Sequence, residues 1–453
     1  MAKKLSPFVY FTGLTLTNVK AFAQAQHLSL TDSNGRPAPW TLIIGENGVG
    51  KTTLLECLAL LRPQASTKKE STLDASKPDK VSPVALADLE NDDIVALARM
   101  GARQVSLVAE LSRGRRLLGG GGQPRKFDVS ATFLMKSGER DFTDFDMSET
   151  TLPGFRAPLV VGYSAARHMR YRRGEITRSS DNPVDSLFDP SIELVDAEEI
   201  LQRLEYAGFK GAPRAEALLR RVKEALVSIL PNLESSDDII LGGPETPGAA
   251  GSSTGVQVIT PYGQVPIGAL SLGYQTVAAW TIDLAWKLFE HYPDAETPMH
   301  EPAIVLIDEI DLHLHPAWQR SIKNAITRVF PQIQFVATAH SPLMVQSFLN
   351  ENIAVLKRKG DHVEIESDPA VVDAWRVDEI LTSDLFGLTS PYPPKIDELF
   401  KERNYLTHLA RRTPAQNARF EEIQREVLSL PTEDNAEDQA VLDRLRKAAA
   451  SAS

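Results

Sequence analysis

One short loop constrains this chain more than any other feature of its sequence. Residues 45–52 read Gly-Glu-Asn-Gly-Val-Gly-Lys-Thr and match the pattern Gly-x-x-x-x-Gly-Lys-[Ser/Thr]. Residues 40–44 are mostly apolar, as in a buried strand, and residues 52–61 have helical character up to Pro63. A strand, a glycine-rich turn and a helix in this order predict an α/β core with a phosphate-binding loop.

The residue types of the loop fit a nucleotide bound with Mg²⁺. Glycines let backbone N–H groups converge on phosphates, and the helix that follows points its positive end at them. Lys51 would reach the β and γ phosphates, and the Thr52 hydroxyl would bind Mg²⁺. The predicted nucleotide-binding residues in this region are Gly45, Glu46, Asn47, Gly48, Val49, Gly50, Lys51, Thr52 and Thr53.

A pair of carboxylates follows a second apolar run. Residues 304–307 read Ile-Val-Leu-Ile, and Asp308 and Glu309 come directly after them. A buried strand would deliver both acids at its end. Asp308 is the predicted metal ligand, directly or through water, and Glu309 is the predicted general base that polarises the attacking water.

Two weaker elements complete the pattern. Ser271 and Gly273 lie in Leu-Ser-Leu-Gly-Tyr-Gln, ahead of a helical stretch at 276–289, where a helix N-terminus could face an anion. His340 follows a buried strand at 334–338. Either element alone would more often have a purely structural role. Their order in the chain, together with the phosphate-binding loop and the carboxylate pair, is what indicates a function.

Together these motifs resemble an ABC-type ATPase, and their details are similar to the SMC/RecF/OLD-like branch of AAA family ATPases. Gly45-Glu46-Asn47-Gly48 resembles the Gly-x-Asn-Gly loop of that branch. The run Asp-Glu-Ile-Asp-Leu-His-Leu-His-Pro at 308–316 resembles its Asp-Glu-x-x-x-x-Leu-His-Pro element, and residues 14–22 resemble its opening strand pair. Among its members, the chain looks most similar to bacterial antiphage-defence ATPases of the PtuA kind.

The resemblance implies a fold and a set of roles. It implies an α/β P-loop ATPase head with a mixed sheet, antiparallel N-terminal strands and a helical lid. ATP and Mg²⁺ would be sandwiched in a homodimer, with Ser271 and Gly273 contacting the γ-phosphate held by the other subunit. His340 would sense the γ-phosphate in its own subunit, and residues 311–315 would lie at the dimer seam. The predicted catalytic residues are thus Lys51, Glu309 and His340.

The sequence departs from the family pattern at two points. Leu272 stands where many relatives have a small residue. The Q-loop glutamine of the family has no clear counterpart, and Gln104 is only a candidate.

Composition limits the partners and the compartment. The net charge is −11, so the chain has no overall basic field for nucleic acid. One cysteine, Cys57, excludes a disulfide within the chain and favours the reducing cytoplasm. No stretch of about 18 apolar residues occurs, which predicts no membrane span.

The motifs divide the chain into four predicted regions. Residues 1–160 would form the N-terminal ATPase lobe, 161–262 a helical insertion, 263–366 the C-terminal lobe and 367–453 a helical extension. Residues 63–82 read as a flexible insertion and residues 85–100 as a helix. Sustained heptads are missing, so long coiled-coil arms are not expected.

A basic run in the insertion leaves two interpretations open. Residues 167–173 include Arg170, Arg172 and Arg173 among aromatic residues, as in some phosphate-contacting surfaces. The other interpretation is a solvated loop that pairs with acids of the same chain, and the acidic composition favours it. A second basic cluster has the same ambiguity and consists of Arg113, Arg115, Arg116, Arg125 and Lys126.

The leading hypothesis is a cytoplasmic ATPase that dimerises around ATP and regulates a partner effector, a nuclease in antiphage defence. No Asp-x-Asp pair at a strand end follows His340, so any cutting would fall to the partner. The alternative is a RecF-like DNA-repair ATPase that binds DNA itself. A transporter nucleotide-binding subunit fits less well, because about 220 residues separate the lysine of the loop from Ser271.

Overall fold

The computed structural model describes residues 8–428 apart from sixteen gaps. The gaps are residues 66–79, 84–94, 115–116, 118–123, 136–141, 154, 167–181, 193, 195, 243–254, 349–350, 368–376, 384–385, 387, 389 and 410. Contacts divide the chain into two compact units, residues 1–386 and 387–453. The predicted boundaries at 160 and 262 both lie inside the first unit.

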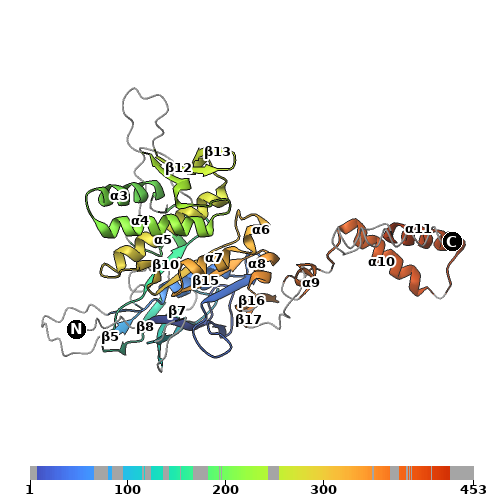
Figure 1. The fold of residues 1–453 in the computed structure, drawn as a ribbon. Coiled ribbons are helices and arrows are strands. Elements are labelled where there is room, and N and C mark those ends of the chain that lie inside the picture. Colours follow the sequence, from blue (N-terminus) through green and yellow to red (C-terminus); the bar gives the residue numbers. More distant parts are fainter. Residues whose placement is uncertain are drawn as a thin grey trace. The chain divides into compact units, whose positions relative to one another are not determined.

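A six-stranded sheet forms the centre of the first unit (Figure 1). The strand order is β10 (Leu159–Tyr163), β14 (Ala303–Ile307), β15 (Ile333–Ala339), β3 (Trp40–Gly45), β16 (Asn352–Lys359) and β17 (His362–Ser367). The first five strands run parallel, and β17 pairs antiparallel with β16. Because β3, β14 and β15 are buried on both faces, their sequences are nearly continuous apolar runs.

A five-stranded antiparallel sheet packs on one side of α1 (Lys51–Leu60). Its order is β2 (Gln26–Ser29), β1 (Val9–Thr17), β6 (Gln104–Arg113), β7 (Arg125–Met135) and β8 (Phe142–Met147). Residues of β1, β6 and α1 share one apolar core with Ile43 of β3. Leu42 and Ile44 belong to the other core, as expected where successive side chains of a strand point to opposite faces.

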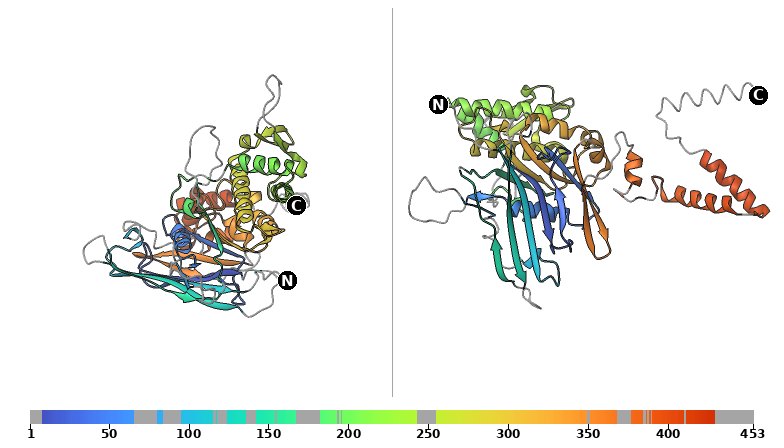
Figure 2. Two further views of the ribbon diagram at one scale, coloured as in Figure 1. Left: turned by 90° about the vertical axis from the view of Figure 1, so that its left-hand side faces the viewer. Right: turned by 90° about the horizontal axis from the view of Figure 1, so that it is seen from below.

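The opposite face of the central sheet is covered by the helical insertion (Figures 1 and 2). The helical layer of the insertion contains α3 (Ala197–Phe209) and α4 (Pro213–Ile229), and it continues after residue 262 with α5 (Leu272–His291). A small sheet beside it consists of β11 (Ile239–Gly242), β12 (Gly255–Thr260) and β13 (Gly263–Pro266). The Asp196 carboxylate caps α3 by accepting from Glu198 N and Glu199 N. Pro213 begins α4, where its missing N–H costs nothing.

Shorter elements complete the first unit. α6 (Pro316–Gln319), α7 (Ile322–Val329) and α8 (Pro342–Ser347) connect strands of the central sheet, and α9 (Val377–Thr382) follows β17. β4 (Gln64–Ala65), β5 (Lys80–Ser82) and β9 (Thr150–Thr151) form a three-stranded sheet.

The second unit contains a helical hairpin. α10 (Pro394–His408) packs on α11 (Pro414–Leu428) around a small core of Leu399, Leu406 and Ile423. Arg419 on α11 pairs with Glu402 on α10 through two hydrogen bonds of 3.0 and 2.8 Å.

The predicted fold class is confirmed: a mixed sheet, antiparallel N-terminal strands and a helical insertion are all present. Two local predictions were wrong. The ends of the predicted flexible insertion, residues 64–65 and 80–82, pair in a sheet through β4 and β5. Helix α5 begins at Leu272, four residues before the predicted start, because Leu-Gly-Tyr-Gln already forms its first turn. The basic run at 167–173 and most of the predicted helix at 85–100 lie outside the described residues. Among the residues that are described, no helix is long and apolar enough to cross a membrane.

A fully buried charge joins the insertion to the central sheet. Asp283 of α5 is 0% exposed and accepts two hydrogen bonds from Lys287 Nζ, at 2.5 and 2.6 Å. The hydroxyl of Tyr163, the last residue of β10, donates to Asp283 Oδ2 at 2.7 Å. A buried carboxylate requires such partners, because desolvation without compensation is costly.

We expect Lys287→Met to destabilise the protein by about 3 kcal/mol, since it leaves the Asp283 carboxylate buried without its cation. Urea unfolding followed by circular dichroism measures the change. The double variant Asp283→Asn/Lys287→Met removes both charges and should recover part of the loss. A single variant as stable as the parent chain would show that the ion pair contributes nothing.

Candidate functional site

The carboxyl ends of the parallel strands meet at one edge of the central sheet, where open α/β sheets bind their ligands. The phosphate-loop sequence follows β3, the carboxylate pair follows β14 and His340 follows β15. Three motifs that are up to about 290 residues apart in the chain therefore become neighbours. They line one cavity of about 260 Å³ with Asn47, Gly48, Gly50, Lys51, Thr52, Thr53, Asp308, Glu309 and His340.

The loop after β3 has the backbone conformation that its glycines allow. Gly48 and Gly50 have φ of +77° and +97°, in the left-handed region that favours glycine. A Cβ on Gly50 would also lie 3.0 Å from the ring of Phe22. Val49 is 1% exposed and packs into the core below, so it anchors the loop while its neighbours face the cavity.

Lys51 is held inside this loop. Its side chain is buried, and Nζ donates to the carbonyl oxygens of Gly45 and Glu46, at 2.8 Å each. Burial lowers the pKa of Lys51 below its ordinary value, and the nearby carboxylates, Asp308 first, act in the opposite direction. The ammonium group is therefore a poorly solvated cation next to a group of acids.

The two predicted metal ligands lie side by side. The Thr52 hydroxyl donates to Asp308 Oδ2 at 2.8 Å. Two oxygens in neighbouring positions on one Mg²⁺, each about 2.1 Å from the ion, are about 3 Å apart, so the spacing fits an octahedral magnesium. No group of three or more His, Cys, Asp or Glu side chains suited to a metal occurs in the described part of the chain. Magnesium typically takes one or two protein ligands and completes its shell with phosphate oxygens and water.

Thr338, the penultimate residue of β15, orients both acids and was missed in the sequence analysis. Its hydroxyl donates to Asp308 Oδ1 at 2.6 Å and accepts from the backbone N–H of Glu309 at 2.7 Å. Asp308 thus receives one hydroxyl on each carboxylate oxygen. The backbone of Glu309 has φ of +49°, a strained conformation for a residue with a side chain. The bond to Thr338 helps to hold it.

The end of β15 is also tied to the segment after the carboxylate pair. Asp311 Oδ2 accepts from the backbone N–H groups of His340 and Ser341, at 3.0 and 2.7 Å. His340 Nε2 lies 3.7 Å from Glu309 Oε1, and both side chains are about one-third exposed. The imidazole is therefore within reach of the predicted general base and of the cavity.

The structure separates Ser271 from this cavity. Ser271 is the exposed N-cap of α5, and its side chain makes no capping hydrogen bond. Gly273 is buried, and a Cβ there would lie only 2.4 Å from the carbonyl oxygen of His313. Glycine is thus required for packing within one chain, where the helix start meets the segment after β14. A contact of Ser271 and Gly273 with nucleotide on a second chain stays a prediction.

Gln104 begins β6 in the antiparallel sheet and does not line the cavity; its carbonyl accepts from Asn18 Nδ2. The end of β10 is also bonded to the site: β10 pairs with β14, and the backbone N–H of Asp308 donates to the carbonyl of Tyr163 at 2.8 Å.

Family comparisons match both ends of this site. Residues 14–143 match a family described as AAA domain, and residues 264–345 match one described as AAA domain, putative AbiEii toxin, Type IV TA system. The first range contains the loop after β3, and the second contains Ser271, the carboxylate pair and His340.

Two curated relatives are proteins of bacterial Septu and retron systems. The chain is 27% identical to Septu protein PtuA of Bacillus mycoides (strain KBAB4) over 84% of its own length and 45% of the relative's. It is 41% identical to the Retron Vc95 probable ATPase of Vibrio cholerae serotype O1 biovar El Tor, over 22% of this chain and 19% of that one. The chain thus spans less than half the length of these relatives.

Among solved structures, the SMC head domain from Thermotoga maritima aligns with a TM-score of 0.39 at 14% identity, over 80% of this chain and 100% of that one. No conclusion about this chain is drawn from that likeness. The fold and the site define a P-loop α/β domain whose two ends match AAA domain families. The resemblance to PtuA-like proteins that the motifs predicted is confirmed by the relatives.

We expect Thr338→Val to slow ATP hydrolysis by about 100-fold with little change in ATP affinity. Valine keeps the shape of the side chain but removes the hydroxyl that orients Asp308 and Glu309, and one such buried bond contributes about 1–3 kcal/mol. Steady-state phosphate release and nucleotide titration separate the two effects.

Thr281→Val is the matched control. Thr281 is also fully buried, and its hydroxyl has no hydrogen-bond partner among the described residues. Equal rates for both valine variants would contradict the role of Thr338.

Proposed function

We propose that this chain binds ATP with Mg²⁺ and hydrolyses the bond between its β and γ phosphates. The observation that carries the proposal is the hydrogen-bonded group at the sheet edge, in which Asp308 joins Thr52 to Thr338. Thr52 and Asp308, which would hold the metal, line one cavity with Lys51 and with Glu309, the proposed general base. Phosphoryl transfer needs this combination, because its catalysis is mainly positioning and charge stabilisation.

Each residue then has a defined step. Lys51 turns from the two loop carbonyls to the β and γ phosphates, and backbone N–H groups of Asn47 to Gly50 bind the remaining oxygens. Mg²⁺, when bound by Thr52 and Asp308, would neutralise phosphate charge. Glu309 accepts a proton from a water molecule while the oxygen of that water attacks the γ-phosphorus, and ADP leaves. His340 contacts the γ-phosphate. The Asp311 carboxylate, which accepts from the backbone N–H of His340, would transmit a shift of His340 to residues 311–315.

The exposed position of Ser271 supports a dimer. Ser271 is exposed and does not line the cavity of its own chain, and its side chain makes no capping hydrogen bond at the start of α5. Two copies related by a two-fold axis would each complete the other's site with Ser271. The segment at 311–315, which packs on Gly273, would lie at the same seam. ATP would then close the dimer, and hydrolysis would release it.

We propose further that the closed dimer controls a partner nuclease in antiphage defence within the cytoplasm. The similarity to Septu PtuA and to retron ATPases supports this role. The cutting would then fall to that partner.

We expect Glu309→Gln to bind ATP normally, to hydrolyse it at least about 100-fold more slowly and to accumulate as an ATP-dependent dimer. Glutamine keeps the shape of the side chain but cannot accept the proton from water. Light scattering coupled to size exclusion, with and without ATP and Mg²⁺, measures the mass. A variant that binds ATP but keeps the same mass in both conditions would remove the sandwich model.

A mixing experiment tests the shared site directly. Lys51→Ala alone should abolish hydrolysis, and Ser271→Arg alone should do the same by blocking the second chain's contribution. Mixing the two variants forms one site with an intact Lys51 from one chain and an intact Ser271 from the other. Hydrolysis should then return to roughly one quarter of the parent rate. Failure to regain any activity, with both variants still binding each other, would mean that each chain acts alone.

A further inference from the structure

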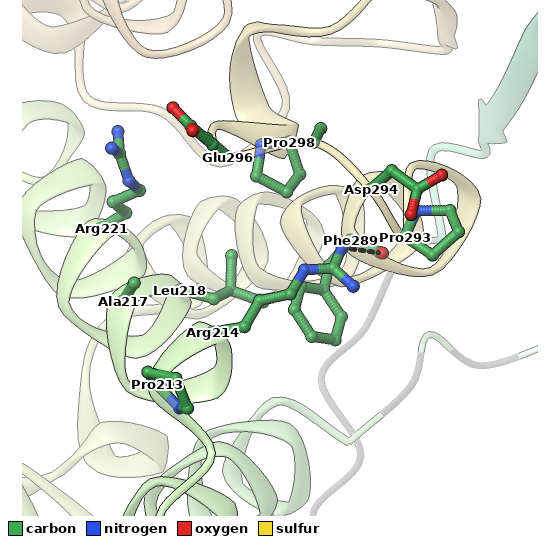
Figure 3. Close-up of a pocket in the computed structure, with 11 residues that line it drawn as sticks. Pro213, Arg214, Ala217, Leu218, Arg221, Phe289, Pro293, Asp294, Glu296 and Pro298 are labelled. Atoms are coloured by element: carbon green, nitrogen blue, oxygen red, sulfur yellow. Dashed lines mark hydrogen bonds between the residues drawn. The ribbon is translucent and has the colours of Figure 1, made fainter. Parts of the chain in front are cut away.

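A second cavity lies in the helical insertion, on residues that take no part in the nucleotide site. It has a volume of about 380 Å³ and lies between the first half of α4 and the segment that follows α5 (Figure 3). Leu218, Phe289 and Pro298 give it apolar walls. Its size is near the lower end of ligand pockets, about 300–1,000 Å³.

Arg214 is the first of two arginines in the lining, and its role is mainly structural. Its Nη2 donates to the carbonyl oxygens of Phe289 and Tyr292, at 3.0 and 2.8 Å, so it caps the C-terminal end of α5. The guanidinium also lies 4.1 Å from the centre of the Phe289 ring. These contacts fix one wall of the cavity.

Arg221 is different, because nothing in the described chain pairs with it. It stands two helical turns after Arg214 and therefore on the same face of α4. No hydrogen bond or ion pair joins Arg221 to another described residue, whereas Arg214 is bonded through Nη2; the Nε of each arginine is buried without an acceptor. A partly buried guanidinium in this state is costly, and an entering carboxylate would offset that cost with charge-assisted hydrogen bonds.

Two exposed acids limit what can enter. Asp294 and Glu296 also line the cavity, and both are exposed. They would repel a run of negative charge, such as a nucleic acid backbone or a polyacidic segment. A single carboxylate attached to an apolar group suits the cavity better. Three prolines in the lining make its walls stiff, which favours a chain end over a continuous segment that must pass through.

We propose that this cavity binds the C-terminal residue of a partner polypeptide. A large apolar side chain packs against Leu218 and Phe289, and the α-carboxylate binds the guanidinium of Arg221. The inference extends the proposed function, since it names where a partner of the ATPase is held.

Binding in this cavity would act on helix α5, because the helix ends next to the cavity. Helix α5 begins after Ser271 and ends at His291, next to the cavity, and spans about 30 Å. Arg214 is bonded to the carbonyls at that far end. A bound chain end would therefore contact one end of the helix whose other end presents Ser271.

Short fluorescent peptides that end in Leu, Phe or Tyr test the proposal by fluorescence anisotropy, with the full chain and without nucleotide. Each peptide is paired with a twin whose C-terminus is amidated. We expect the free-carboxylate form of at least one peptide to bind at least about tenfold more tightly than its twin. Equal binding of both forms for every peptide, or no binding by any of them, would overturn the proposal.

Two variants and one control locate the binding. Arg221→Gln removes the charge, and Ala217→Leu fills the cavity with a residue that favours helix; each should weaken binding at least about tenfold. Arg220→Gln is the matched control, because Arg220 is the exposed neighbour that faces Glu224 and does not line the cavity. Equal effects of the changes at 220 and 221 would place the peptide elsewhere. Since no nucleotide is present, the result is independent of whether the chain hydrolyses ATP.

Discussion

The hydrogen bonds around Asp308 are the interaction on which the arrangement of the site depends. One carboxylate oxygen accepts from Thr52 at the start of α1, and the other accepts from Thr338 near the end of β15. The backbone N–H of Asp308 donates to the last residue of β10. A single residue, 7% exposed, therefore fixes three parts of the sheet edge relative to one another. Burial makes these bonds matter, because an unsatisfied carboxylate there would cost several kcal/mol.

This arrangement requires the apolar sheet beneath it. β3, β14 and β15 are buried on both faces, so the polar groups at their ends are held by stiff strands rather than by loops. The strain at Glu309 and the positive φ of His313 lie in the segment directly after β14. Strained backbone of this kind persists only where surrounding contacts hold it, and it often occurs at functional sites. Here the contacts come from Thr338 and Asp311.

Local patterns predicted the parts of the fold and the site that depend on neighbouring residues. The strand, loop and helix around Gly48 form as expected, because apolar runs, glycines and helix-forming residues act within a few positions. Thr338 was missed, since its importance comes from a hydrogen bond to a residue 30 positions away. The packing role of Gly273 was missed for the same reason: the atom that excludes its side chain is the carbonyl of His313.

Helix α5 connects three features that lie apart in the sequence: Ser271, the edge of the sheet around Asp308 and the second cavity. Its first end carries Ser271 and packs through Gly273 on the segment after the carboxylate pair. Its middle holds Asp283, which binds Tyr163 at the end of β10, and the carbonyl of Tyr163 accepts from Asp308. Its last turn is capped by Arg214 in the wall of the second cavity. Packed helices shift as units rather than bending continuously, because interiors are close-packed. A displacement of α5 by a bound partner would therefore act on Ser271 and on the Asp308 edge together, and ATP, by fixing both, would act on the far cavity in return.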